Sequence, residues 1–123
     1  MIDKKFFYAV VGASKNKEKY GYKIFKDLLE SGYKVLPINP NEKKILEKEV
    51  YPSLSQVKEN IDVVIFATQP KITEKILEEA KILWINNAWL QPWSESKKAI
   101  LFCKENNITC TYNTCIMIQK NKK

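Results

Sequence analysis

The residues best suited to chemistry in this chain form a short loop of small and polar side chains after an apolar run. Residues 6–11 are nearly all apolar, and residues 12–16, Gly-Ala-Ser-Lys-Asn, follow them directly. Gly12 allows the backbone to turn tightly and approach an anion, and Ser14 offers a hydroxyl group. Successive amides around Lys15 can then cradle a phosphate where the loop leads into a helix. A plain tight turn would use the same residues, so the pattern leaves both interpretations open.

This loop departs from the best-known nucleotide motifs. Residues 14 and 17 are Ser and Lys, so the full G-x-G-x-x-G fingerprint is absent, and the chain has no G-x-x-x-x-G-K-[ST] sequence. An NAD site places Asp or Glu at the end of the second strand, whereas Asn39 and Pro40 stand there, followed by Lys43 and Lys44. A lysine pair beside an adenosine suits an additional ribose phosphate, as in NADP or coenzyme A (CoA). Alternatively, the two lysines are a solvated charge run.

Several kinds of catalysis are excluded by residue types that the chain lacks. It contains no His and no Arg, so its 21 basic residues are all Lys. Ser-His and Cys-His nucleophile pairs, phosphohistidine and imidazole metal sites are therefore excluded. Cys103, Cys110 and Cys115 form neither a CxxC pair nor a zinc pattern, so we expect no metal and no structural disulfide. Cys115 is the one candidate nucleophile, but no neighbouring cations would lower the pKa of its thiol, and we expect no catalytic residue.

The elements that must position the loop alternate in type along the chain. Short apolar runs alternate with stretches of helical period, which predicts an α/β fold, a doubly wound parallel sheet with helices on both faces. We predict the strand order 3-2-1-4-5, and Pro37 indicates an edge position or a strand end for the second strand. Residues 41–50 are a charged excursion, and the end of the chain is a short polar tail. The predicted strands are residues 6–11, 34–38, 63–67, 82–85 and 108–112, and the predicted helices begin near Tyr20, Ser53, Ile72 and Ser94.

Length and composition favour one intracellular domain. The 123 residues, 45% of them hydrophobic, suffice for a single core, so residues 1–123 are taken as one domain. Neither a membrane span nor a secretory signal is visible, and we expect a soluble, cytoplasmic protein without a membrane partner. The net charge of +7 invites a nucleic-acid interpretation. The lysines are scattered among glutamates rather than clustered, so we expect no nucleic-acid partner.

Taken together, the motifs resemble those of a known family. The chain resembles the small stand-alone CoA-binding proteins, which are similar to the CoA-binding domain of the succinyl-CoA synthetase alpha subunit. The resemblance extends over nearly the whole chain, and the combination of its pieces at this spacing is specific. The pieces are Val-Val-Gly-Ala-Ser at 10–14, Gly-Tyr-Lys-Val-Leu-Pro-Ile-Asn-Pro at 32–40, Val-Tyr-Pro-Ser-Leu at 50–54, Ile-Asp-Val-Val at 61–64, Trp84-Ile85, and Cys115.

The resemblance implies a Rossmann-like fold with CoA lying across the strand ends. It implies that Gly12, Ala13 and Ser14, beside Lys15, hold the pyrophosphate. It also implies that the adenosine and its 3′-phosphate are bordered by residues at the end of the second strand, and that the segment after the third strand flanks the pantetheine or the adenine. These two groups are Asn39, Pro40 and Lys43 or Lys44, and Ala67, Thr68, Gln69 and Pro70.

One segment departs from the family pattern and keeps other functions open. The family commonly has Gln and then Gly after the tryptophan of the fourth strand, whereas residues 86–88 after Trp84 are Asn-Asn-Ala. We therefore expect a non-catalytic or regulatory protein that binds CoA or an acyl-CoA. The alternatives are an NADP-dependent oxidoreductase and a ligand-free protein-interaction module of the same fold. The tryptophans further predict a homodimer or partner surface near Trp89 and Trp93.

Overall fold

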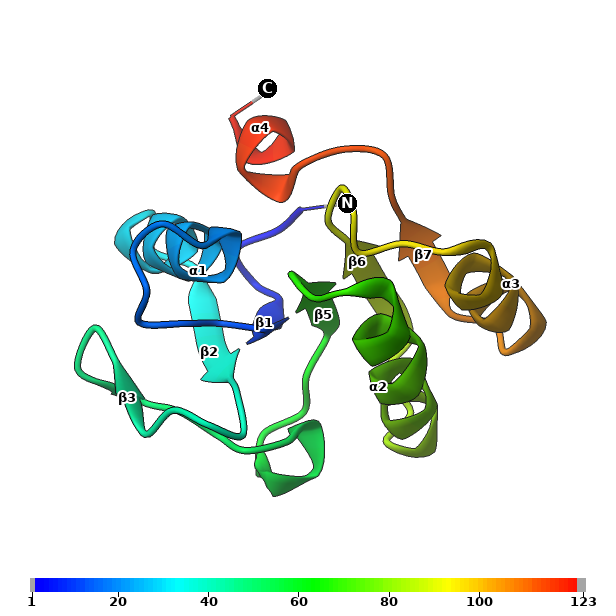
Figure 1. The fold of residues 1–123 in the computed structure, drawn as a ribbon, viewed down its shortest axis with the longest axis horizontal. Helices are drawn as coiled ribbons and strands as arrows, with labels where there is room; N and C mark the ends of the chain where they lie inside the picture. The colour runs from blue at the N-terminus through cyan, green and yellow to red at the C-terminus, as the bar shows by residue number, and fades with distance from the viewer. Residues whose placement is uncertain (1, 122–123) are drawn as a thin grey trace.

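The computed structural model describes residues 2–121 and has one main parallel sheet. Its five strands run in the order β2-β1-β5-β6-β7, and every neighbouring pair is parallel (Figure 1). The predicted α/β, doubly wound, Rossmann-like architecture is therefore confirmed. The strands are β1 (Phe7–Val11), β2 (Lys34–Ile38), β5 (Val63–Phe66), β6 (Asn87–Leu90) and β7 (Thr109–Thr111).

Three of these strands end level with one another. Val11 at the end of β1 pairs with Ile38 of β2 on one side and with Phe66 of β5 on the other. All four residues of β5 are buried, as expected for a central strand that is covered on both faces. The loops after these strands therefore start from one edge of the sheet, where ligands of such folds bind.

The predicted strand order 3-2-1-4-5 is wrong in one respect. Counted along the chain, the sheet strands follow the order 2-1-3-4-5, because β5 pairs with β1 rather than with β2. Pro37 gives the physical reason: a residue without a backbone N–H is tolerated in an edge strand, and β2 is that edge. The strand order consequently reverses between β1 and β5.

Helices cover both faces of the sheet, as predicted. On one face α1 (Tyr20–Glu30) packs beside α4 (Ile116–Lys120), and on the other α2 (Pro70–Ile82) packs beside α3 (Lys97–Glu105) (Figure 1). Each face has its own apolar core, and Phe25 of α1 is a fully buried member of the first. Within the part of the chain that the structure describes, no helix is both long and apolar enough to span a membrane.

The connection from β2 to β5 is less regular than predicted. The charged excursion forms a small antiparallel hairpin, β3 (Lys44–Ile45) and β4 (Lys48–Glu49). The expected helix after Ser53 is the single 3₁₀ turn η1 (Leu54–Gln56), and the Ser53 side chain makes no capping hydrogen bond to it. A compact, mostly non-helical segment therefore leads across to β5.

The second half of the chain differs from the prediction in three elements. The predicted fourth strand at residues 82–85 is wrong: α2 extends to Ile82, and β6 begins only at Asn87. Ser96 rather than Ser94 caps α3, because the Ser96 hydroxyl accepts a hydrogen bond from the Ala99 amide at 3.0 Å. The expected polar tail contains α4, whose Ile116 is fully buried against α1.

Candidate functional site

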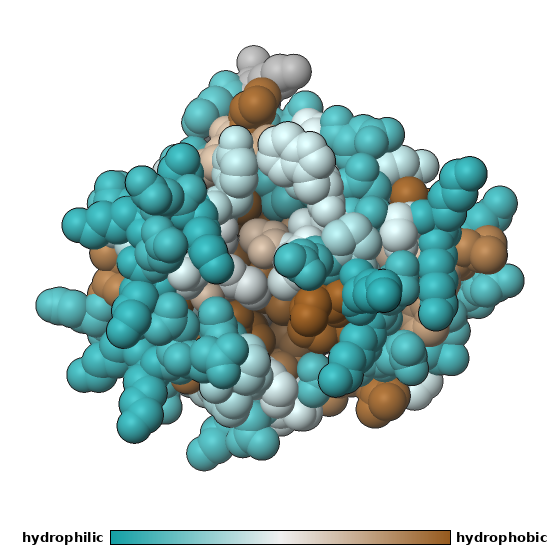
Figure 2. All heavy atoms as spheres, viewed as in Figure 1, coloured by the Kyte–Doolittle hydropathy of each residue, from teal (hydrophilic) through white to brown (hydrophobic). Residues whose placement is uncertain are grey.

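A large cleft opens at the carboxyl ends of β1, β2 and β5, where the strand order reverses. Its volume is about 1630 Å³, above the ~300–1,000 Å³ of pockets for drug-sized ligands, so it has room for an extended ligand. Figure 2 shows the hollow, with an apolar interior and a mostly hydrophilic surround. The lining comes from the strand ends, the first turn of α1, one side of α2 along its length, residues 52–53, the turn after β6 and the segment around Cys115.

Gly12 forms the floor of the cleft with backbone rather than side chain. It has a φ of +89°, and a Cβ at this position would collide with the carbonyl oxygen of Ala67. The Gly12 amide donates to the Ile38 carbonyl at 3.1 Å, and the Ala67 amide donates to the Val11 carbonyl at 3.0 Å. The loops after the three strands are thus in direct contact at this point.

Gly21 brings the start of α1 onto the same loop. A Cβ at Gly21 would collide with the carbonyl oxygen of Gly12, so only glycine permits this approach. Sequence reasoning missed Gly21, although a signal was present. It is one of three glycines in the chain and lies in the first turn of a helix, where glycine costs about 1 kcal/mol relative to alanine.

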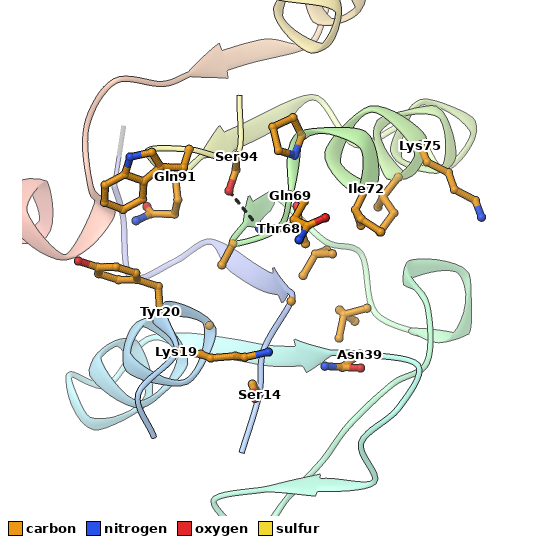
Figure 3. A pocket seen from close by; sticks show the side chains of 18 of the residues that line it. Ser14, Lys19, Tyr20, Asn39, Thr68, Gln69, Ile72, Lys75, Gln91 and Ser94 are labelled. Carbon is orange, nitrogen blue, oxygen red and sulfur yellow. Dashed lines mark hydrogen bonds between the residues drawn. The ribbon is translucent and has the colours of Figure 1, made fainter. Parts of the chain in front are cut away.

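The N-terminus of α1 has the properties of an anion site. Lys19 occupies the cap position without a capping hydrogen bond from its side chain, and the first turn carries no acidic residue. The Tyr22 and Lys23 amides donate to the Lys19 carbonyl at 3.1 and 3.2 Å, which leaves the Tyr20 and Gly21 amides of the first turn without a partner within the helix. The helix dipole places partial positive charge at the same end. Figure 3 shows the Lys19 ammonium group pointing into the cleft toward the end of β1. Sequence reasoning missed Lys19 although it placed the helix start correctly near Tyr20, because the sequence does not show that this side chain points into the cleft.

Several loop groups that were expected to hold an anion already have partners. The Lys15 amide donates to Glu42 Oε2 at 3.1 Å, and the Lys15 ammonium lies 3.8 Å from Glu42 Oε1. The Asn16 amide donates to Ser14 Oγ at 3.0 Å, which leaves the Ser14 hydroxyl proton free to donate. The donors available to a ligand are therefore the Ser14 hydroxyl, the first two amides of α1, at Tyr20 and Gly21, and the Lys19 ammonium group.

The structure brings most of the predicted site residues to the cleft. Asn39 also has a structural role: its Nδ2 donates to the Ala13 carbonyl at 2.7 Å, and its Oδ1 accepts from the Asn41 amide at 2.8 Å. The cleft is lined by Gly12, Ser14, Asn39, Pro40, Ala67, Thr68, Gln69 and Pro70. Outside the lining are Ala13, which is fully buried, and the exposed Lys15, Lys43 and Lys44.

The turn after β6 ties the C-terminal segment to the cleft. Gln91 is almost completely buried; its Nε2 donates to Cys115 Sγ at 3.2 Å and its Oε1 accepts from the Ile116 amide at 2.9 Å. Ser94 Oγ accepts from the Thr68 amide at 3.0 Å (Figure 3). Sequence reasoning missed Gln91 and Ser94 because the strand before them was misplaced.

The placement of β6 also changes which tryptophan lies in the fourth strand of the sheet. The tryptophan inside the strand is Trp89, and Gln91 follows it by two residues. Trp89 is buried, and its indole N–H donates to the Thr114 carbonyl at 3.0 Å, so it belongs to the core rather than to a partner surface. Trp84 and Trp93, in contrast, are 87% and 72% exposed.

The cleft has two lysines of its own. Lys19 lies at the start of α1, and Lys75 lines the cleft from α2. Glu18, Glu78 and Glu79 also line it, so its charge is mixed. Lys75 could not be predicted, because its place in the cleft depends on how α2 packs against the crossing segment, which contacts it at η1. Among residues 2–121, no three Cys, Asp or Glu side chains gather as metal ligands would.

Comparison with known proteins places the chain in a family. The model of the CoA binding domain matches residues 7–121. An ADP-forming acetate–CoA ligase II of Archaeoglobus fulgidus is 38% identical over 73 residues, which cover 58% of this chain and 11% of the ligase. The uncharacterized protein YneT of Bacillus subtilis is 26% identical over 115 residues, covering 89% of this chain and 82% of YneT. The chain thus spans about a tenth of the length of that ligase.

A solved structure extends the comparison to the whole fold. A conserved hypothetical protein from Pyrococcus furiosus superimposes with a TM-score of 0.89 at 36% identity, covering 93% of this chain and 98% of the other. The family match supports CoA as the ligand class, in agreement with a cleft that offers an anion site between two apolar ends. Because the family model matches nearly the whole described chain, this chain belongs to the CoA binding domain family.

Proposed function

We propose that this chain binds CoA or an acyl-CoA across the carboxyl ends of β1, β2 and β5, as a non-catalytic or regulatory protein. The observation that carries the proposal is the uncapped N-terminus of α1, held directly on the Gly12 loop inside a cleft of about 1630 Å³. A pyrophosphate in the middle of an extended ligand is the group that such a helix end binds best. The net charge of +7 adds a favourable field for a polyanion.

The adenosine belongs at the end of the cleft beside β2. Asn39 and Pro40 border it there, and Ile72 and Ile76 of α2 supply an apolar surface for the adenine ring. Lys75 lies at the same end and provides a cation for the 3′-phosphate. Lys43 and Lys44 remain the competing candidates for that phosphate, on the exposed hairpin outside the cleft lining.

The pantetheine arm then runs from the pyrophosphate toward Gln91 and Cys115. Cys115 Sγ already accepts a hydrogen bond from Gln91 Nε2 at 3.2 Å, so the thiol helps to hold the turn after β6 against the C-terminal segment. This structural contact supports a binding role rather than catalysis at Cys115.

The test is calorimetric titration of nucleotide-free protein with CoA, dephospho-CoA, NADP and NAD at one fixed salt concentration. We expect CoA to bind and dephospho-CoA to bind more weakly. NADP binding without CoA binding would instead indicate a redox protein, and no binding of any of the four would favour an interaction module. Either of these results would overturn the proposal.

Matched lysine variants assign the phosphates. Lys19→Ala should weaken CoA binding about fivefold, because a half-exposed ion pair contributes up to ~1 kcal/mol, while Lys17→Ala in the same loop should have no effect. Lys75→Ala should remove the difference between CoA and dephospho-CoA. If the double variant Lys43→Ala/Lys44→Ala removes that difference instead, the 3′-phosphate lies at the hairpin.

A further inference from the structure

The turn after β6 contains a tryptophan where the backbone favours glycine. The Ser94 amide donates to the Gln91 carbonyl at 2.8 Å, which closes a four-residue turn with Pro92 and Trp93 in the middle. Trp93 has a φ of +76°, the value that the third position of a type II turn requires. Gly or Asn is preferred at that position, because a bulky side chain in the left-handed region is strained. The chain therefore keeps a strained residue at the edge of its cleft.

The Trp93 side chain is also poorly covered by the protein. The indole is 72% exposed and contacts the ring of Tyr20, with the ring centres 5.7 Å apart and the planes tilted by 42°. Tyr20 is the first residue of α1 and is itself 48% exposed. The pair thus joins the turn after β6 to the start of α1, and neither ring packs in the core.

A third exposed apolar side chain lines the same cleft from α4, the helix that follows Cys115. Ile118 of α4 lines the cleft and is 57% exposed. We refer to Tyr20, Trp93 and Ile118 together as the apolar rim. Exposed apolar groups that gather beside a cleft mark a surface that a ligand or partner covers. The strained backbone of Trp93 is a second and independent sign of function at the same place.

The position of the apolar rim relates it to one part of the ligand. The turn that carries Trp93 also carries Gln91 and Ser94, so the rim lies at the end of the cleft that contains Cys115, opposite the adenosine end. Of the two lysines that line the cleft, Lys75 is on α2 and the ammonium group of Lys19 points away from the Tyr20 ring (Figure 3). The Lys23 ammonium group, outside the cleft lining, lies 5.3 Å from the centre of the Tyr20 ring. The rim side chains themselves are apolar, so the ligand group that they would cover best is a hydrocarbon.

Building on the proposed CoA-binding function, we infer that the apolar rim holds the hydrocarbon acyl chain of an acyl-CoA. Free CoA ends in a thiol, which would leave the three rim side chains largely exposed. A chain of about four to six carbons, attached through the thioester, would extend past Cys115 and cover them.

The inference is tested by titrating the protein with CoA, butyryl-CoA, hexanoyl-CoA and succinyl-CoA. Full burial of one methylene strengthens binding about fourfold. At the open rim each acyl carbon is only partly buried, so we expect each to strengthen binding about twofold. Butyryl-CoA should therefore bind about tenfold more tightly than CoA. Hexanoyl-CoA should bind more tightly still. Succinyl-CoA has the same four acyl carbons as butyryl-CoA but ends in a carboxylate, so it has less hydrocarbon to bury and should gain less than butyryl-CoA.

Two tryptophan variants locate the effect. Trp93→Gly suits the turn and should fold at least as well as the natural chain; it should bind CoA within about twofold but lose the gain from the acyl chain. The matched control is Trp84→Gly, because Trp84 is also highly exposed and has a φ of +61°, but does not line the cleft. It should keep the gain in full.

The results distinguish failure of the acyl-chain site from failure of CoA binding itself. If CoA binds and the hydrocarbon chains bring no gain, the acyl role of the apolar rim is wrong and CoA binding stands. If Trp84→Gly loses the gain as well, or Trp93→Gly keeps it, the rim does not hold the chain. If neither CoA nor any acyl-CoA binds, the proposed function and this inference fail together.

Discussion

Replacing Gly21 by alanine sets two effects on stability against each other. The helical preference of alanine should stabilise the fold, and the close packing of α1 on the Gly12 loop should destabilise it. In an ordinary helix, Gly→Ala stabilises the fold by about 1 kcal/mol. At Gly21 the new Cβ would collide with the carbonyl oxygen of Gly12. Because non-bonded atoms settle about 3.5 Å apart, the start of α1 must move outward by on the order of 1 Å. We therefore expect destabilisation of about 1–3 kcal/mol, the range for overpacked sites.

The same displacement should weaken CoA binding by at least about tenfold, because the helix N-terminus would no longer lie over Gly12. Free energies of unfolding in urea and calorimetric titration with CoA measure the two effects. The matched control is Gly32→Ala, where φ is +85° and the space around the new Cβ is open. That control should lose about 1 kcal/mol of stability from its left-handed backbone and bind CoA normally.

Two results would refute this reasoning about Gly21. One is a stabilised Gly21→Ala variant, which would mean that the helix preference outweighs the contact with Gly12. The other is a destabilised variant with unchanged CoA affinity, which would separate the position of α1 from the ligand. The Gly32→Ala control shows whether a loss of stability alone lowers the measured affinity.

Three further predictions concern single side chains. Asn39→Ala should lower the free energy of unfolding in urea by about 1 kcal/mol and weaken CoA binding, because it removes the hydrogen bond to the Ala13 carbonyl; unchanged values would contradict the role of Asn39 in fixing the loop. Gln91→Leu should cost about 1–3 kcal/mol by leaving the Ile116 amide without its partner, and should speed amide exchange in α4; native exchange there would speak against it. Burial raises the pKa of Tyr8 above 10.0, so the folded state keeps the phenol protonated where the unfolded state ionises, and stability should fall as pH rises past 10. Tyr8→Phe should reduce that fall in urea unfolding at pH 9 and pH 11, and an identical pH dependence in both proteins would rule Tyr8 out as a cause.

The general architecture could be predicted from the sequence because its signals are local. The buried apolar run of β5 predicts a strand, and the apolar stripe of helical period in α1 predicts a helix. Neither prediction depends on the rest of the chain. The strand order is a different kind of property, since it depends on which strand β5 meets. Pro37 already indicated an edge position for β2. The order 3-2-1-4-5 places the second strand inside the sheet, so it is incompatible with that edge position.

Candidate site residues could be predicted where they directly follow a strand that is clear in the sequence. Gly12, Ser14 and Asn39 follow clear strands and line the cleft. Lys75 and Trp93 line the cleft because of the tertiary structure. The position of Lys75 depends on how the chain crosses from β2 to β5, and the position of Trp93 depends on where β6 begins. The apolar stretch at residues 82–85 looked like a strand, but Ile82 ends α2 and is 74% exposed.

The contact between Gly12, Gly21 and Ala67 has a consequence for how ligand preference can change in this fold. Because these three segments contact one another through backbone atoms, a side chain added at Gly12 or Gly21 would displace all three segments together. Changes of ligand preference should therefore be tolerated best at lining side chains such as Tyr20, Lys75 and Trp93, which lie outside this backbone contact. A library that varies these positions and holds the three contacting residues constant should yield folded proteins with altered ligand choice at high frequency.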